Sequence, residues 1–132
     1  RVAPGEAVCH GDFHPGNVFL TSAGTRIIDW MDATYGNPLA DVARSSFLLS
    51  KSVFPADMPQ RSLIGLIRGI FHRTYLARYF NQLRPDPREW NAWCTLVAAA
   101  RLAEDVPGER QVLIGMVKSG LGKNSASSAK DE

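Results

Sequence analysis

The chain has 132 residues, 45% of them hydrophobic, which suits a single domain that buries a core. Its net charge of +2 comes without a basic run, so no nucleic-acid partner is indicated. Arg or Gly interrupts every apolar stretch well short of the about twenty residues that span a bilayer, so we expect no membrane partner. No secretory signal opens the chain, and Cys9 and Cys94 are expected as free thiols in a reducing cytoplasm.

The first thirty residues predict a strand, a loop and a hairpin. Ala7–Cys9 is an expected strand, and His10–Gly16 is an expected loop because it is rich in Gly and Pro. Two short apolar runs, Val18–Leu20 and Arg26–Ile28, flank a five-residue connection that contains a glycine. This arrangement predicts a β-hairpin.

Helices are predicted for most of the remaining chain. Residues 32–38 are an expected loop, and a second loop bounded by Pro55 and Pro59 should follow the first helix. The tail over 120–132 is rich in Gly, Ser, Ala and Lys without apolar anchors, so we expect it to be disordered. Apolar spacing and Pro breaks predict helices over 39–50, 60–83, Asp86-Pro87 to about 104, and 109–118.

Three polar side chains lie close together in this pattern. Asp12 and Asn17 belong to the expected loop, and Asp29 should lie at the end of the second hairpin strand, directed back toward Asn17. Mg²⁺ prefers hard oxygen ligands, one or two from protein and the rest from phosphate and water. Asn17 and Asp29 can supply the protein oxygens, which leaves Asp12 to accept a proton from an attacking hydroxyl. The spacing therefore indicates phosphotransferase chemistry.

Four sequence elements in one order extend this interpretation. They are His10-Gly11-Asp12-x-x-x-x-Asn17, the hairpin, Ile28-Asp29-Trp30, and Pro38-x-x-Asp41-Val42-Ala43. The combination resembles the C-terminal lobe of the aminoglycoside phosphotransferase and choline kinase-like family, which shares its fold with protein kinases. The resemblance is specific over residues 8–44. It implies a mainly α fold with a small β-hairpin, a kinase-like α+β lobe over 1–119, and an N-terminal lobe that is absent from the chain.

The resemblance also implies a role for each polar residue. Asp12 would be the catalytic base, and Asn17 and Asp29 would hold the Mg²⁺ of bound ATP or GTP. His14 would contact the transferred phosphate. Two further residues would support the loop: His10 through hydrogen bonds, and Asp41 by accepting backbone N–H groups. Asn37 stands where the family frequently has an aspartate, and its amide can still cap the loop.

The implied reaction is in-line transfer of a γ-phosphoryl group to the hydroxyl of a small molecule. No Gly-rich phosphate loop and no strand lysine precede the motif, and the chain begins at Arg1 without a methionine. We therefore expect a fragment whose partner is the N-terminal lobe of the same protein, and no turnover from the isolated chain. The alternative is a catalytically silent kinase-like lobe that acts as a binding module.

Other interpretations of single clusters stay open at this point. Cys9, His10, Asp12 and His14 could belong to a metallohydrolase, with His72 as the one further histidine. Several aromatic side chains could form a cage for a cation: Tyr75, Tyr79, Trp90 and Trp93. Acidic residues could bind an amino group: Glu89, Glu104 and Asp105. A series of arginines should form a solvated helix flank: Arg68, Arg73, Arg78 and Arg84.

Overall fold

Two small antiparallel sheets carry the N-terminal third of the chain. The computed structural model describes residues 2, 4–51 and 59–128. β1 (Ala7–Cys9) pairs with β4 (Thr34–Gly36), and β2 (Val18–Thr21) pairs with β3 (Gly24–Ile27). A short 3₁₀ turn, η1 (Pro15–Asn17), closes the loop that precedes β2.

The hairpin was predicted, but its turn is tighter than expected. Thr21 pairs directly with Gly24, so two residues rather than five connect the strands. Gly24 has a φ of +104°, which a residue with a side chain rarely adopts, and this permits the tight turn. The expectation of a loop over 32–38 is wrong for Thr34–Gly36, because these residues form β4 against β1.

Four helices make up the rest: α1 (Pro38–Ser50), α2 (Arg61–Leu83), α3 (Pro87–Leu102) and α4 (Arg110–Ser128). The first three confirm the predicted helices to within about two residues. Pro87 occupies the first turn of α3, and Asp86 Oδ1 accepts a hydrogen bond of 2.7 Å from Arg88 N, so the predicted helix start is confirmed. The predicted loop around Pro55 lies outside the described residues.

The fourth helix contradicts the predicted tail. α4 continues through Ser128, so the expectation of a tail without regular structure is wrong for 120–128, while 129–132 lie outside the described residues. Beyond the apolar contacts of Leu113, Met116 and Val117, α4 lies close to α3 at a glycine. A Cβ on Gly120 would lie 1.9 Å from Thr95 Oγ1 on α3. Because the missing side chain lets the two helices approach closely, α4 docks where hydrophobicity gives no signal.

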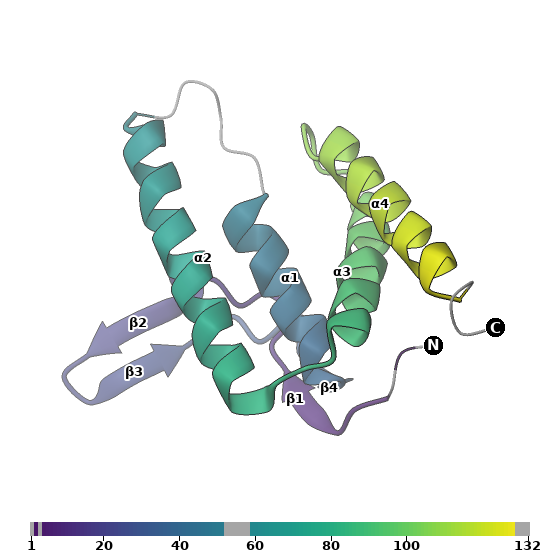
Figure 1. Ribbon diagram of the computed structural model, residues 1–132. Coiled ribbons are helices and arrows are strands. Elements are labelled where there is room, and N and C mark those ends of the chain that lie inside the picture. Colours follow the sequence, from purple (N-terminus) through teal and green to yellow (C-terminus); the bar gives the residue numbers. More distant parts are fainter. Residues whose placement is uncertain (1, 3, 52–58, 129–132) are drawn as a thin grey trace.

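α1 is the central helix of the lobe. It contacts α2 on one side and α3 on the other, with β1 near its N-terminal end, and α4 packs on α3 (Figure 1). Phe47, Ala98 and Leu113 form the buried cluster between α1, α3 and α4. Beside it Glu109, 2% exposed, is held by Arg101, whose Nε lies 2.8 Å from its Oε2. This pairing makes the buried carboxylate tolerable.

α2 packs differently from the other helices. None of its residues is buried, and its apolar face is exposed at Leu63, Ile67 and Ile70. The hairpin is open as well, with Phe19 and Leu20 half or more exposed. Within the described residues no helix is long and apolar enough to cross a membrane. The mainly helical fold with small antiparallel sheets is the predicted architecture of a kinase-like lobe.

Candidate active site

A carboxylate on α1 holds the loop that carries the candidate catalytic residues. Asp41 Oδ1 accepts a hydrogen bond of 2.7 Å from Gly11 N, and Asp41 Oδ2 accepts one of 3.0 Å from His10 N. Gly11 has a φ of +82°, and a Cβ there would lie 2.4 Å from the carbonyl oxygen of Asp32. Only glycine satisfies both the backbone angle and the contact, so the loop has one conformation available at this point.

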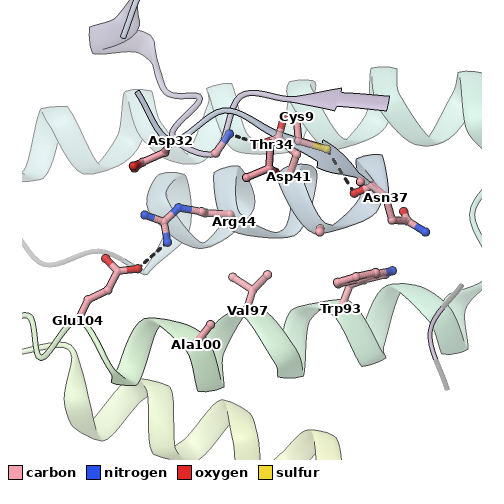
Figure 2. Close-up of a pocket in the computed structure, with 13 residues that line it drawn as sticks. Cys9, Asp32, Thr34, Asn37, Asp41, Arg44, Trp93, Val97, Ala100 and Glu104 are labelled. Carbon is pink, nitrogen blue, oxygen red and sulfur yellow. Dashed lines mark hydrogen bonds and ion pairs between the residues drawn. The ribbon is translucent and has the colours of Figure 1, made fainter. Parts of the chain in front are cut away.

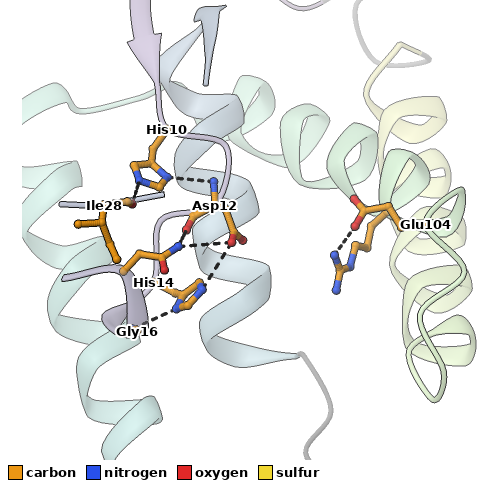
Figure 3. Close-up of polar contacts among 8 residues, drawn as sticks. His10, Asp12, His14, Gly16, Ile28 and Glu104 are labelled. Carbon is orange, nitrogen blue, oxygen red and sulfur yellow. Dashed lines mark hydrogen bonds and ion pairs between the residues drawn. The ribbon is translucent and has the colours of Figure 1, made fainter. Parts of the chain in front are cut away.

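The His10 imidazole ties this loop to the segment that precedes Asp29. His10 is 4% exposed, and its Nδ1 accepts a hydrogen bond of 3.2 Å from Asp12 N. Nε2 therefore carries the ring proton and donates a hydrogen bond of 2.9 Å to Ile28 O (Figure 3). The Trp30 ring lies beside the imidazole, with centroids 4.6 Å apart. His10 thus braces two parts of the site without facing solvent.

Asp12, Asn17 and His14 meet at the end of the loop. Asn17 Nδ2 donates to Asp12 O at 3.0 Å and lies 3.4 Å from Asp12 Oδ2. His14 Nδ1 accepts from Gly16 N at 3.0 Å, and His14 Nε2 lies 3.5 Å from Asp12 Oδ2 (Figure 3). The Asp12 side chain is 30% exposed, so a small molecule can reach its carboxylate. Among the described residues nothing hydrogen-bonds to Asn17 Oδ1, which leaves that oxygen for a ligand.

Asp29 lies two residues beyond the end of β3 rather than at the strand end. Ile28 N donates to Asn17 O at 3.0 Å, which ties the residue before Asp29 to the loop. Asp29 itself has a φ of +62° and an exposed side chain. Aspartate is one of the few residues with a side chain that tolerates this left-handed conformation. The tie through Ile28 fixes the backbone just before Asp29 to the loop at Asn17.

The zinc alternative lacks the donor set that it needs. The Cys9 thiol is 5% exposed and faces the Asn37 carbonyl at 3.6 Å, while burial and then the charge of Asp41 raise its pKa. His72 instead bonds Ser46 Oγ at 2.8 Å, between α2 and α1. Among the described residues no three His, Cys, Asp or Glu side chains are placed to hold a metal.

The four aromatic residues do not form one cage. Tyr75 stacks on Phe13 at 5.7 Å, and Tyr79 follows it on α2, where burial and then Tyr75 raise the pKa of Tyr79 to about 12. Trp90 instead packs edge-on against Phe80 at 5.0 Å, and Trp93 lines a separate pocket. The cage hypothesis is therefore not supported by the arrangement.

The acidic residues that could have bound an amino group also have separate partners. Glu104 Oε1 pairs with Arg44 at 2.6 Å, whereas Asp105 is exposed and lies 3.7 Å from Arg110. Burial alone would raise the pKa of Glu104, but Arg44 and then Arg101 lower it below its ordinary value. Arg68 is not simply a solvated flank, because its Nη2 donates to the Leu48 carbonyl and burial lowers its pKa.

The sequence did not predict the contact between Asn37 and Glu89; its only signal was an asparagine where the family frequently has an aspartate. Asn37 Oδ1 accepts from Leu39 N at 2.8 Å and caps α1, while Asn37 Nδ2 donates to Glu89 Oε1 on α3 at 3.1 Å. An aspartate could cap the helix equally well but could not donate to a glutamate. The amide at this position is thus explained by its partner on α3.

Asn37→Asp should destabilise the fold by about 1–2 kcal/mol, because an N–H donor is replaced by an oxygen that faces Glu89. Glu89→Gln restores a donor, so the double variant should return to within about 0.5 kcal/mol of the parent. Denaturant midpoints of the parent, of each single variant and of the double variant measure these changes in stability. An Asn37→Asp loss that Glu89→Gln leaves unchanged would contradict the explanation.

The mainly helical fold with its small antiparallel sheets is consistent with a kinase-like lobe. The chain belongs to the phosphotransferase enzyme family, whose sequence model matches residues 2–93. The match covers both sheets, α1, α2 and the first part of α3, and it confirms the resemblance to aminoglycoside phosphotransferases. No curated protein and no solved structure matches the chain.

Proposed function

We propose that the chain is the catalytic lobe of a small-molecule kinase that transfers the γ-phosphoryl group of ATP or GTP to a hydroxyl. One observation carries the proposal. Asn17 bonds to Asp12 with its side chain and to Ile28 with its backbone, so the candidate base, one candidate metal ligand and the residue before the other share one hydrogen-bonded junction. Phosphoryl transfer depends mostly on such positioning and on charge neutralisation.

The residues present fit a magnesium ion. Asn17 Oδ1 and the exposed Asp29 carboxylate are hard oxygen donors, and the backbone before Asp29 is bonded to Asn17. Mg²⁺ commonly takes one or two protein ligands and completes its shell with phosphate and water. When bound, the ion would neutralise charge on the phosphates of the nucleotide. Asn17 and Asp29 are accordingly the proposed metal ligands.

Asp12 is the proposed proton acceptor. Asn17 Nδ2 and His14 Nε2 both lie near its Oδ2, at 3.4 and 3.5 Å, and these donors orient the carboxylate. The partly exposed carboxylate can then accept the proton of an incoming hydroxyl. His14 is fixed at Nδ1 by Gly16 N, so its Nε2–H is available to a phosphate oxygen as well.

The partner of this lobe is proposed to be a second lobe of the same protein. Exposed apolar side chains cover α2 and the hairpin, including Leu66 at 61% and Leu20 at 86%. Contiguous apolar surface of this kind marks an interaction site. A lobe that covers the phosphates would complete nucleotide binding, so we expect the chain alone to bind nucleotide weakly and to show no turnover.

Paramagnetic broadening tests the metal site on this chain. We expect Mn²⁺, added as a magnetic substitute for Mg²⁺ with millimolar ATP, to broaden the amide signals of Asn17 and Asp29 first. Asp29→Asn should weaken this effect about tenfold or more, since even outer-shell partners of a metal are worth that much. Asp105→Asn, at an exposed carboxylate on the far end of α3, is the matched control. Broadening centred elsewhere, or unchanged in Asp29→Asn, would reject the assignment.

A further inference from the structure

α2 carries an apolar stripe on the side that faces away from α1. The side toward α1 is polar: Arg68 donates to Leu48 O, and His72 bonds Ser46 Oγ at 2.8 Å. The opposite side holds four apolar residues at i, i+3, i+4 and i+7, which share one helix face. Each is more than half exposed, and together we call them the α2 stripe: Leu63, Leu66, Ile67 and Ile70. Among the described residues nothing covers this stripe, which marks it as an interaction surface.

A groove continues the stripe toward the C-terminal end of α2. Phe71 and Thr74 lie about one turn beyond the stripe and line a cavity of about 340 Å³. Phe13 and Tyr75, whose ring centroids lie 5.7 Å apart, line it on the side of the loop after β1. A large apolar side chain that projects from a partner can enter such a groove as an anchor.

The helix that carries the stripe is basic and has no acidic residue. From Gln60 to Pro85 the charged side chains are all arginines: Arg61, Arg68, Arg73, Arg78 and Arg84. Arg73 and Arg78 are exposed and, at about 100° per residue, lie roughly 70° to either side of the centre of the stripe. Arg78 also lines the groove. Within the part of the chain that the structure describes, neither arginine pairs with a carboxylate.

A second copy of this chain does not fit the stripe. Two α2 helices packed face to face would bring only arginines against one another, and such like-charge contacts oppose association. The C-terminal helices do not offer carboxylates either, because Glu104 bonds Arg44 at 2.6 Å (Figure 2) and Glu109 is 2% exposed. An anionic bilayer would match the charge of α2. It has no projecting side chain for the groove, however, whereas a protein partner does.

We propose that the α2 stripe and its groove dock an amphipathic helix whose apolar ridge is flanked by Asp or Glu. The ridge would pack along the stripe, and one large apolar side chain would enter the groove beside Phe13. The flanking carboxylates would pair with Arg73 and Arg78. That this helix belongs to the complementary lobe rests on the proposed function, whereas the preference of the surface for an acidic helix does not.

Two helical peptides test the proposal. Both carry a Leu ridge at i, i+3, i+4 and i+7, and the flanking positions are Glu in one peptide and Lys in the other. Each is titrated into the ¹⁵N-labelled chain. We expect the Glu peptide to give saturable shifts at the amides of Ile70, Thr74 and Phe13. The Lys peptide should bind at least about tenfold more weakly, because attraction at two exposed arginines becomes repulsion. Equal or tighter binding of the Lys peptide, or no saturable shift, would overturn the proposal.

Matched substitutions locate the binding. Arg78→Glu should weaken binding of the Glu peptide about threefold or more and strengthen binding of the Lys peptide. Arg110→Glu, at an arginine on α4 that is 70% exposed, should change neither. Ile70→Gln should abolish the shifts and Leu96→Gln, at a 46% exposed position on α3, should retain them. Equal effects of a substitution and its control in folded variants would reject the α2 stripe as the docking site.

The other occupants give different results. Binding of the chain to vesicles of phosphatidylcholine and phosphatidylglycerol, without saturable binding of the Glu peptide, would assign the stripe to a membrane surface. A dimer in sedimentation equilibrium that Ile70→Gln dissociates would assign it to a second copy. Either result would overturn the proposal. None of these measurements uses nucleotide, so docking of the Glu peptide by a chain that proves inactive would separate failure of the proposed function from failure of this inference.

Discussion

Asp12→Asn should reduce the turnover number of the enzyme, assayed with its complementary lobe, by about 100-fold or more while nucleotide affinity stays within about threefold. The amide keeps the shape of the side chain and its place beside Asn17 Nδ2 and His14 Nε2. It cannot accept the proton of the hydroxyl. Removal of a positioned base affects the transition state and leaves ground-state binding largely intact.

Steady-state rates with varied nucleotide, together with direct nucleotide titration, distinguish the two effects. Asp105→Asn is a useful control, because Asp105 is an exposed carboxylate whose described ion-pair partner is Arg110. A comparable loss of turnover in the control, or equal losses of binding and turnover in Asp12→Asn, would contradict the assignment of Asp12 as the base.

Asp41→Ala should destabilise the chain by about 2–5 kcal/mol. The substitution removes both acceptors of the His10 and Gly11 amides, and each unsatisfied N–H at a buried position costs about 1–3 kcal/mol. His10 itself is 4% exposed, so water cannot easily replace the carboxylate. Because His10 also bonds Ile28, the loss should loosen the segment before Asp29 as well.

Urea unfolding at neutral pH measures this effect. Asp105→Asn removes the charge of a carboxylate that is 83% exposed and keeps a residue that tolerates the φ of +47° at this position, so it should change the free energy of unfolding by less than about 0.5 kcal/mol. Hydrogen exchange of the Gly11 amide should accelerate in Asp41→Ala beyond the global change if the bond is local. A loss below about 1 kcal/mol would show that Asp41 is not the anchor of the loop.

The local parts of the fold were predictable because their causes are local. Pro87 after Asp86 gives a helix start from two adjacent residues, and the glycine between two apolar runs gives the hairpin. The spacing of Asp12 and Asn17 along one loop also suffices to place them near one another, and Ile28, which precedes Asp29, bonds to Asn17. Their roles in metal binding and proton transfer stay predictions.

Other features depended on residues far apart in the chain. Thr34–Gly36 is too short and too polar to indicate a strand, and it becomes β4 only because β1 offers it hydrogen-bond partners. Asn37 identifies its own helix cap but not Glu89, which α3 brings within 3.1 Å. Gly120 was interpreted as a flexible residue, whereas its lack of a side chain lets α4 approach Thr95.

The sequence by itself determined the loop after β1, the hairpin and the helix starts, since these follow from backbone geometry and from hydrogen bonds between near neighbours. Only the tertiary structure decided how His10 connects the loop to Ile28, and how α1 and α3 line a common pocket. These features need side chains from separate elements at hydrogen-bond distance. Packing sets such distances, and the packing of α1 against α3 is not encoded by the pattern of either helix alone.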